Sequence, residues 1–334
     1  MNDILHFQKG IQGRRILVIG DVMLDHYLYG NSNRISPEAP VPVVNLEKSE
    51  YRLGGAANVA LNIQAMGAMP YLCGMIGKDE SANRFFQLME QENLNTDFLF
   101  SSGHRPTTKK SRILGNGQHL LRVDEESTAD LSTEESGQAF DLISQAVSTQ
   151  KPEVILFQDY NKGFLTETLI QQIIGLAKQH GIKTIVDPKF KNFLSYKGVD
   201  LFKPNLKELR EGLGKNIEVS EASLRGACQM LQEKIQAKSI LVTLSEHGVF
   251  AFENDSWKLI PTLPREILDV CGAGDAVIAV CALALLANLD ATSIGQLANL
   301  AGGLVCESLG VVPIPAKSFF AELGSPNFYN TPLH

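Results

Sequence analysis

Short apolar runs of strand length alternate with amphipathic stretches along most of the chain. The apolar runs cover residues 15–20, 70–76, 154–157, 183–186 and 239–243, and helical periodicity marks residues 134–147, 166–180 and 221–237. This alternation predicts βα units that build a mainly parallel sheet with helices on both faces. The apolar stretch 276–289 is shorter than the roughly 20 residues of a bilayer-spanning helix and predicts a buried core helix instead.

Two segments interrupt this rhythm. Residues 27–46 contain three prolines, and within residues 97–123 the runs 108–114 and 119–123 predict a hairpin around Gly115-Asn116-Gly117. We expect both segments to contribute the strands of a small β-sheet lid. Such a lid leaves an open edge and an uncovered face, which pairing with a second copy commonly covers. The sequence therefore predicts a homodimer that forms through the lid.

Length, charge and cysteine content narrow the class of protein. With 334 residues, 44% of them apolar, the chain can form one large α/β domain, expected over residues 1–325, with residues 326–334 as a poorly ordered tail. The net charge of -7 argues against nucleic acid as the main partner. The five cysteines include no Cys-x-x-Cys pair, and the N-terminus lacks a signal-peptide pattern. These features predict a cytoplasmic protein with no membrane partner.

The segment Asp269-Val-Cys-Gly-Ala-Gly-Asp275, directly before the predicted core helix, carries the clearest chemical signal. Gly272, Ala273 and Gly274 let the backbone approach a ligand, and N–H groups at a helix start bind phosphate. Asp275 could then take a proton from an attacking hydroxyl while the helix start stabilises the transferring phosphoryl group. The alternative is a tight turn whose Asp caps the helix.

A dinucleotide-binding fold is a weak alternative. Its Gly-x-Gly-x-x-Gly turn should follow the first strand, where this chain has Gly20-Asp-Val-Met-Leu-Asp25. Asp25, together with Gly54, Gly55 and Asn58 at the expected start of a helix, suits a ligand with several hydroxyl groups. The same residues also fit an ordinary turn and helix start.

Taken together, these motifs resemble the ribokinase-like, PfkB-type carbohydrate kinases over nearly the whole chain. Within that family the chain is similar to the bacterial D-glycero-β-D-manno-heptose 7-phosphate kinases. The resemblance rests on Asp21-Val-Met-Leu-Asp25, Arg34-Ile-Ser-Pro-Glu-Ala-Pro-Val-Pro-Val-Val44, Gly54-Gly-Ala-Ala-Asn58, Asp159-Tyr-Asn-Lys-Gly163, Pro204-Asn-Leu-Lys-Glu208 and the Gly-Ala-Gly-Asp loop. The segment from Arg34 to Val44 discriminates best.

The resemblance implies a ribokinase-like three-layer α/β/α sandwich with a mainly parallel sheet and a small β-sheet lid. It also implies a sugar-phosphate kinase that uses ATP and Mg²⁺ to phosphorylate the heptose at its anomeric hydroxyl, in ADP-heptose and lipopolysaccharide core biosynthesis. A requirement for a monovalent cation stays open. Asp275 matches the catalytic base of the family, and Asn205 and Glu208 match its Asn-x-x-Glu motif, with Glu208 acting on Mg²⁺ through bound water.

Further residues match nucleotide and substrate positions of the family. Thr243, Ser245 and Gly248 resemble its nucleotide-binding turn, and Asn299 matches a position near the adenine, although Thr and Ser after a strand are also common local caps. The substrate's own phosphate needs fixed positive charge. Four basic residues are candidates for binding this phosphate. Lys110 and Arg112, at i and i+2 of a predicted strand, lie on one face of it, although they could also belong to a solvated charged strand. Lys162 and Lys189 follow the ends of predicted strands.

One position departs from the family, because Cys271 stands where many relatives have Thr. A thiol is a weaker hydrogen-bond donor, so a contact to phosphate would be weakened; a reactive thiol and a buried inert cysteine are the two readings of this residue. Two other functions stay open: a kinase for ribose, fructose or fructose 6-phosphate, and a sugar-phosphate sensor that does no catalysis. Because the chain ends at His334, we expect it to perform the kinase step alone, with another protein supplying adenylyl transfer.

Overall fold

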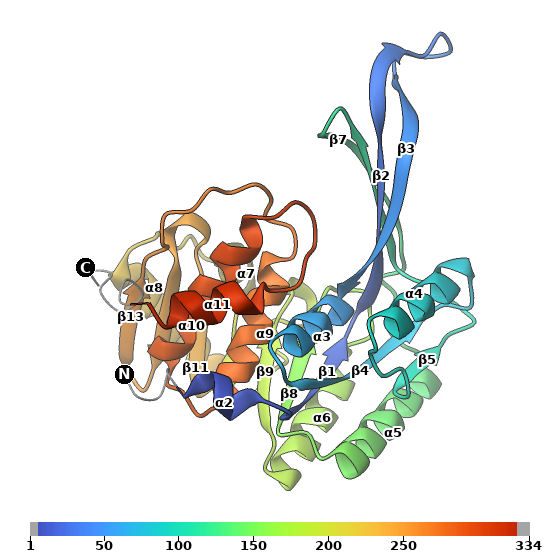
Figure 1. Ribbon diagram of the computed structural model, residues 1–334. Helices are drawn as coiled ribbons and strands as arrows, with labels where there is room; N and C mark the ends of the chain where they lie inside the picture. Colours follow the sequence, from blue (N-terminus) through green and yellow to red (C-terminus); the bar gives the residue numbers. More distant parts are fainter. Residues whose placement is uncertain (1–5, 326–334) are drawn as a thin grey trace.

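A nine-stranded sheet forms the middle layer of the computed structural model, which describes residues 6–325 (Figure 1). The strand order is β13-β12-β11-β10-β9-β8-β1-β4-β5. From β11 to β5 all neighbours are parallel, while β12 and β13 add an antiparallel edge. The strands are β1 (Arg15–Gly20), β4 (Met69–Ile76), β5 (Leu99–Ser101), β8 (Val154–Gln158), β9 (Lys183–Asp187), β10 (Leu201–Phe202), β11 (Ser239–Thr243), β12 (Val249–Glu253) and β13 (Ser256–Ile260).

Helices cover both faces of this sheet, each over its own apolar cluster. Side chains alternate along β1, so that Ile16 and Val18 belong to one cluster and Leu17 and Ile19 to the other. The first cluster includes α2 (Phe7–Ile11), α3 (Ala56–Ala65), α4 (Glu80–Gln91), α9 (Ala273–Leu286), α10 (Ala291–Cys306) and α11 (Ala316–Leu323). The second includes α5 (Thr133–Gln150), α6 (Glu167–His180), α7 (Leu206–Leu213) and α8 (Glu221–Ile235). The predicted sandwich of three layers is confirmed.

Helix α9 is the central helix of the first layer. All of its residues from Asp275 to Leu286 are buried, which is the pattern of a helix surrounded by protein. The predicted core helix is therefore present, but it ends at Leu286 rather than at residue 289, because Asn288 adopts a left-handed conformation with φ 59°. Among the described residues, no helix is long and apolar enough to cross a membrane.

A separate four-stranded sheet forms the lid, which projects from the body as a long hairpin beside a shorter one (Figure 1). Its order is β3-β2-β6-β7, from β2 (Val22–Ile35), β3 (Pro42–Gly55), β6 (Lys109–Gly115) and β7 (Gln118–Glu125). The predicted hairpin is confirmed. Its two turn residues, Asn116 and Gly117, have φ 53° and 78°, as a tight hairpin turn of this kind requires.

The predicted limits of the lid are wrong in two places. The long hairpin spans residues 22–55 rather than 27–46, because pairing continues from Val22 with Gly55 to Ile35 with Pro42. Asp25 therefore lies within a lid strand, and Gly54 and Gly55 end the next one. Residues 99–101 do not join the lid, since Leu99 pairs with Gly74 as β5 at the edge of the large sheet. The predicted tail, residues 326–334, lies outside the described residues.

Candidate active site

Polar residues follow the carboxyl ends of five adjacent strands of the large sheet. Asp21 comes directly after β1, Gln158 ends β8, Asp187 ends β9, Lys203 follows β10 and Thr243 ends β11. Four of these side chains are buried, with Thr243 half-buried. This edge of an open parallel sheet is where ligands usually bind. Only Asp21 separates β1 from the first lid strand, so the lid starts at the same edge.

The carboxylate of Asp275, in the first turn of α9, accepts three side-chain hydrogen bonds. Asn58 Nδ2 donates to Oδ2 over 2.8 Å, while Gln158 Nε2 at 3.0 Å and Tyr160 Oη at 2.6 Å donate to Oδ1. Asn58 has no exposed surface, and its side-chain oxygen accepts a hydrogen bond from Asn62 Nδ2 over 3.3 Å. Three elements of the fold thereby hold one carboxylate: α3, β8 and the loop after β8.

Burial raises the pKa of Asp275 to about 6. The hydrogen bonds from Tyr160 and Asn58 lower it in part, and the nearby carboxylates of Asp187 and Asp25 raise it. A carboxyl group with this pKa is ionised at neutral pH yet can accept a proton more readily than an ordinary aspartate. Asp275 therefore has the electrostatics of a general base.

The loop before Asp275 has the backbone form that the glycines predict. Gly272 is the N-terminal cap of α9 with φ 80°, a conformation that favours glycine. A Cβ on Gly274 would lie 4.0 Å from Asp187 Oδ2, so the loop passes directly over the end of β9. Gly272 and Gly274 thus bring backbone N–H groups of the helix start to the strand ends, beside Asp275. The N–H of Ala273, also predicted for this role, donates instead to Val270 O over 3.3 Å.

Asp21 organises the loop that carries Tyr160. It accepts backbone N–H groups from Tyr160 at 2.8 Å, Lys162 at 3.0 Å and Phe164 at 3.3 Å. Burial and the nearby Asp159 raise the pKa of Asp21 to about 6 against these hydrogen bonds. Asp159 in turn accepts from the hydroxyl of Tyr196 at 2.7 Å. The three bonds to Asp21 fix where the Tyr160 hydroxyl can meet Asp275.

Sequence reasoning missed Tyr160, Gln158, Asp187 and Lys203 as members of the site. Tyr160 lay within the segment Asp159–Gly163 that supported the family resemblance, and position at a strand end was the available signal for the other three. Lys203 and Asp187 form an ion pair of 3.1 Å with side chains 3% and 6% exposed. The pair lies beneath the glycine loop, where it supplies fixed charge of both signs.

Asn205 and Glu208, predicted to organise metal and phosphates, form the cap of α7. The Asn205 side chain accepts from Glu208 N, and Glu208 Oε2 accepts from Asn205 N, both over 2.8 Å. Glu208 Oε1 is bonded to Lys189 Nζ. Burial opposes the charge of Lys189, but Asp187 and Glu208 outweigh it and raise the pKa of the lysine. Glu208 is therefore a buried member of a charge network and no helix-surface residue.

The predicted nucleotide residues divide into two groups. Thr243 forms an isolated bridge with Asn205, which places it beside the α7 cap, and Ser245 begins a short 3-10 helix (Ser245–His247). Gly248 has φ 91°, and a Cβ there would overlap Ile260 O. Asn299 Nδ2 donates to Pro261 O over 2.6 Å. The structure thus gives Gly248 and Asn299 structural contacts with the strand β13 and the loop after it.

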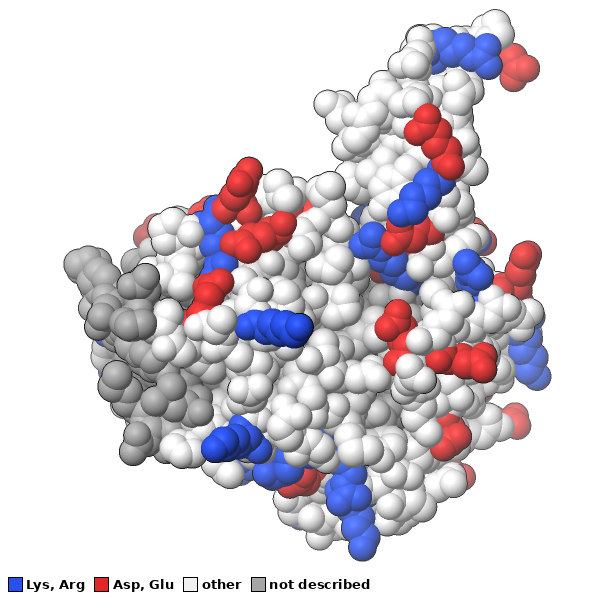
Figure 2. Space-filling view, viewed as in Figure 1, with Lys and Arg blue, Asp and Glu red and all other residues white. Residues whose placement is uncertain are grey.

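The lid brings its charged residues to the same edge. Arg112 Nη1 bonds to Asp25 Oδ1, and a Cβ on Gly54 would overlap the Asp25 carboxylate, so glycine is needed there. Gly55, with φ 58°, lies against Asp21 O in the same way. Lys110 from the lid and Lys162 from the body both bond to Glu126. Figure 2 shows basic and acidic side chains side by side along the lid and at its base.

Cys271 does not have the character of a reactive thiol. Burial, with a hydrogen bond to Asp269, raises its pKa to about 11. Since the thiolate is the reactive form, the inert reading of this cysteine is the one the geometry supports.

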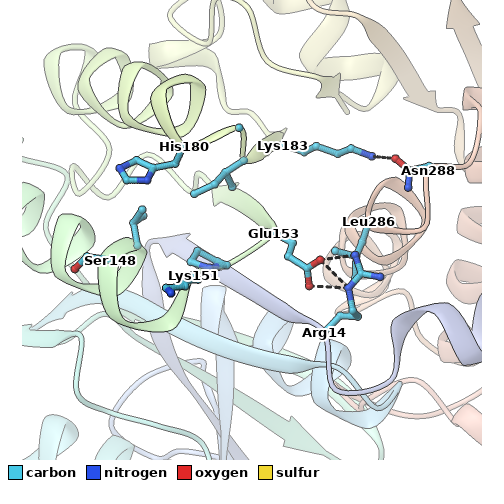
Figure 3. A pocket seen from close by; sticks show the side chains of 12 residues that line it. Arg14, Ser148, Lys151, Glu153, His180, Lys183, Leu286 and Asn288 are labelled. Carbon is cyan, nitrogen blue, oxygen red and sulfur yellow. Dashed lines mark hydrogen bonds and ion pairs between the residues drawn. The ribbon is translucent and has the colours of Figure 1, made fainter.

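A hollow of about 630 Å³ lies at the opposite edge of the sheet (Figure 3). The residues that line this hollow include those at the starts of β8 and β9. Arg14 bonds to Glu153, and Lys183 donates to Asn288 Oδ1 and Leu285 O. None of the predicted site residues lines this hollow, so it is separate from the candidate active site.

Comparison with known proteins agrees with this geometry. The profile of a family described as pfkB family carbohydrate kinase matches residues 14–317. The chain belongs to the pfkB family of carbohydrate kinases. Bifunctional protein HldE of Aliarcobacter butzleri is 42% identical over 296 residues, covering 88% of this chain and 61% of that protein. Its counterpart in Helicobacter pylori strain G27 is 38% identical over 297 residues, covering 89% and 64%.

Solved structures of pfkB-type kinases share the fold. Phosphofructokinase-2 from Escherichia coli in complex with potassium has a TM-score of 0.76 at 18% identity, covering 94% of this chain and all of that one. Ribokinase from Arabidopsis thaliana, complexed with ribose and ATP, has a TM-score of 0.72 at 17% identity, covering 93% and 99%. The pfkB chain described here spans less than two thirds of the HldE proteins that it matches.

Proposed function

We propose that this pfkB kinase transfers the γ-phosphoryl group of ATP to the anomeric hydroxyl of D-glycero-β-D-manno-heptose 7-phosphate. The observation that carries the proposal is the buried Asp275 carboxylate, held by three donors at the N-terminus of α9. The similarity to HldE proteins, whose kinase half phosphorylates heptose 7-phosphate, and the Arg34–Val44 segment support this substrate. The product would be the 1,7-bisphosphate used for ADP-heptose.

In this mechanism Asp275 removes the proton of the anomeric hydroxyl as its oxygen attacks the γ-phosphorus. The bond from that phosphorus to the β,γ-bridging oxygen breaks, and ADP leaves. The N–H groups of Gly272 and Gly274 stabilise the negative charge on the transferring oxygens, whereas the N–H of Ala273 donates to Val270 O. We propose direct transfer from ATP to the sugar hydroxyl, with no covalent intermediate on the protein.

Residues at the other strand ends are suited to the rest of the nucleotide. Mg²⁺ is usually held by one or two carboxylates together with phosphates and water. Glu208 and Asp187 supply two carboxylates at the edge where the parallel strands end. When bound, Mg²⁺ would neutralise charge on the β- and γ-phosphates. Asn205 is bonded to Glu208, Thr243 bridges Asn205, and Ser245 follows shortly after Thr243; these three would contact the nucleotide. Gly248 and Asn299 would support the backbone around the nucleotide site.

Substrate groups would meet the lid. Asp25 would accept hydrogen bonds from sugar hydroxyls, with Gly54 leaving room for its carboxylate. Positive charge comes from Lys110 and Arg112 of the lid and from Lys162 and Lys189 of the body. Lys110 and Lys162 both bond to the carboxylate of Glu126. A phosphate at the end of the sugar that is remote from Asp275 fits this distribution of charge.

An ADP-release assay with purified protein, ATP and Mg²⁺ tests the substrate. The account predicts that kcat/KM for heptose 7-phosphate exceeds that for ribose, fructose and fructose 6-phosphate by about a hundredfold, because charge-assisted bonds to the 7-phosphate are lost or misplaced in the others. Preference for another sugar would discard the heptose assignment. Turnover of none of them would favour a sensor.

The pKa of Asp275 sets a pH dependence. Because the base must be ionised, kcat/KM should fall about tenfold per pH unit below a midpoint near 6. Tyr160→Phe removes a hydrogen bond that lowers this pKa, so the midpoint should move up by about one pH unit. Tyr196→Phe is the control, since Tyr196 is a buried tyrosine whose hydroxyl bonds to Asp159 and not to Asp275. Equal midpoints in all three proteins would contradict the role of Tyr160.

We also propose a homodimer that forms through the lid, in the cytoplasm where ATP is available. Six large apolar side chains of the lid are exposed: Ile35, Val41, Leu46, Leu120, Leu121 and Val123. An exposed apolar patch on a sheet with open edges commonly marks an interface.

Light scattering at micromolar concentrations should therefore give the mass of a dimer. Leu121→Asp, at a side chain 60% exposed, should yield monomers, whereas Met69→Asp on the body, 48% exposed, should not. A wild-type monomer would refute the dimer.

A further inference from the structure

One carboxylate, that of Glu126, bridges two lysines from different parts of the molecule. Glu126 Oε2 accepts from Lys110 Nζ of the lid over 3.0 Å, and Oε1 accepts from Lys162 Nζ of the body over 2.6 Å. The lysine side chains are 13% and 14% exposed and that of Glu126 is 21% exposed. Each carboxylate oxygen thus faces one ammonium group, in partial shelter from water.

The Glu126 carboxylate lies between the two lysines as a bound anion would. Two oxygens of a phosphate would each accept from one lysine in the same way, with greater charge than a carboxylate carries. Glu126 comes directly after β7, and the chain beyond it is tied down by Arg105, which donates to Ser127 O over 2.9 Å and Ala129 O over 3.1 Å. Arg105 also donates to Lys162 O, so one arginine holds both the segment after Glu126 and the backbone of Lys162.

We propose that Glu126 is a built-in placeholder for the phosphate of the substrate, which occupies the Lys110–Lys162 subsite in the free enzyme and leaves it when the substrate binds. This inference rests on the proposed function for the identity of the phosphate-bearing sugar. The subsite itself would take any small phosphate-like anion that can reach it.

The placeholder would hold the side chains of Lys110 and Lys162 in position until the substrate binds. Burial opposes the charge of Glu126, but its bonds to Lys162 and Lys110 outweigh burial and lower its pKa. A sugar without a phosphate could not replace this carboxylate, because it would leave Lys162 without a counter-charge in a sheltered site and Lys110 with only Asp124, to which it also donates over 3.0 Å. Glu126 would therefore raise selectivity for phosphorylated sugars at the expense of affinity.

Glu126→Gln tests the inference by removing the charge while keeping the shape. With the competitor gone, the KM for heptose 7-phosphate should fall about tenfold, the size expected from one charge-assisted hydrogen bond. The inhibition constant of inorganic phosphate against the sugar should fall to a similar extent. In the absence of any sugar, inorganic phosphate should raise the Tm of the variant more than that of the wild type.

Glu125→Gln is the matched control. Glu125 is the neighbouring residue and pairs with Lys109 over 2.7 Å, but it is 54% exposed and does not contact Lys110 or Lys162. None of the three readouts should change in this variant. A Glu125→Gln protein that behaves like Glu126→Gln would show a general charge effect and overturn the placeholder.

Other outcomes for Glu126→Gln also decide the matter. A higher KM with weaker phosphate binding would mean that Glu126 supports the lysines or holds the lid, and a lower kcat for every sugar would mean that it contacts the sugar itself. Either result overturns the inference. The phosphate-dependent Tm needs no turnover, so it can fail while heptose 7-phosphate is still the preferred substrate, or succeed if another phosphorylated sugar is the true one.

Discussion

The structure depends on placing one buried carboxylate where a helix begins and parallel strands end. Removing an ionised group from water is costly unless donors replace the solvent. Asn58, Gln158 and Tyr160 supply those donors to Asp275 from three separate parts of the fold. The glycine loop and the N-terminus of α9 bring the positive end of a helix to the same point. The α/β/α sandwich thus brings three separate elements together at one carboxylate group.

A second constraint is the balance of charge where the lid meets the body. Each of four basic residues has a carboxylate partner: Lys110, Arg112, Lys162 and Lys189. A site for a substrate with a phosphate needs these cations, yet a cluster of unpaired cations would repel and would loosen the lid. The carboxylates resolve this conflict, and in the exchange that we propose the phosphate of the substrate takes the place of one of them.

Much of this arrangement follows from local sequence, and the rest depends on tertiary contacts. The limits of β1 and β11 are as predicted, because buried parallel strands are uniformly apolar. The lid was placed less accurately, since β2 and β3 are largely exposed over their outer halves and lack a regular alternation. Asp275 and its glycines are recognisable from their spacing. Tyr160, Gln158, Asp187 and Lys203 are not, because a lone polar residue after a strand resembles any turn, and only the fold shows that the strand ends converge.

The measurement that tests the central claim most directly compares Asp275→Asn with the wild type in a single-turnover assay, alongside ATP binding by calorimetry. The substitution keeps the shape of the side chain and removes its ability to take a proton. The account predicts that the phosphoryl-transfer rate falls by about three powers of ten or more while the affinity for ATP changes little. A variant that transfers phosphate at a near-normal rate would show that Asp275 is not the base.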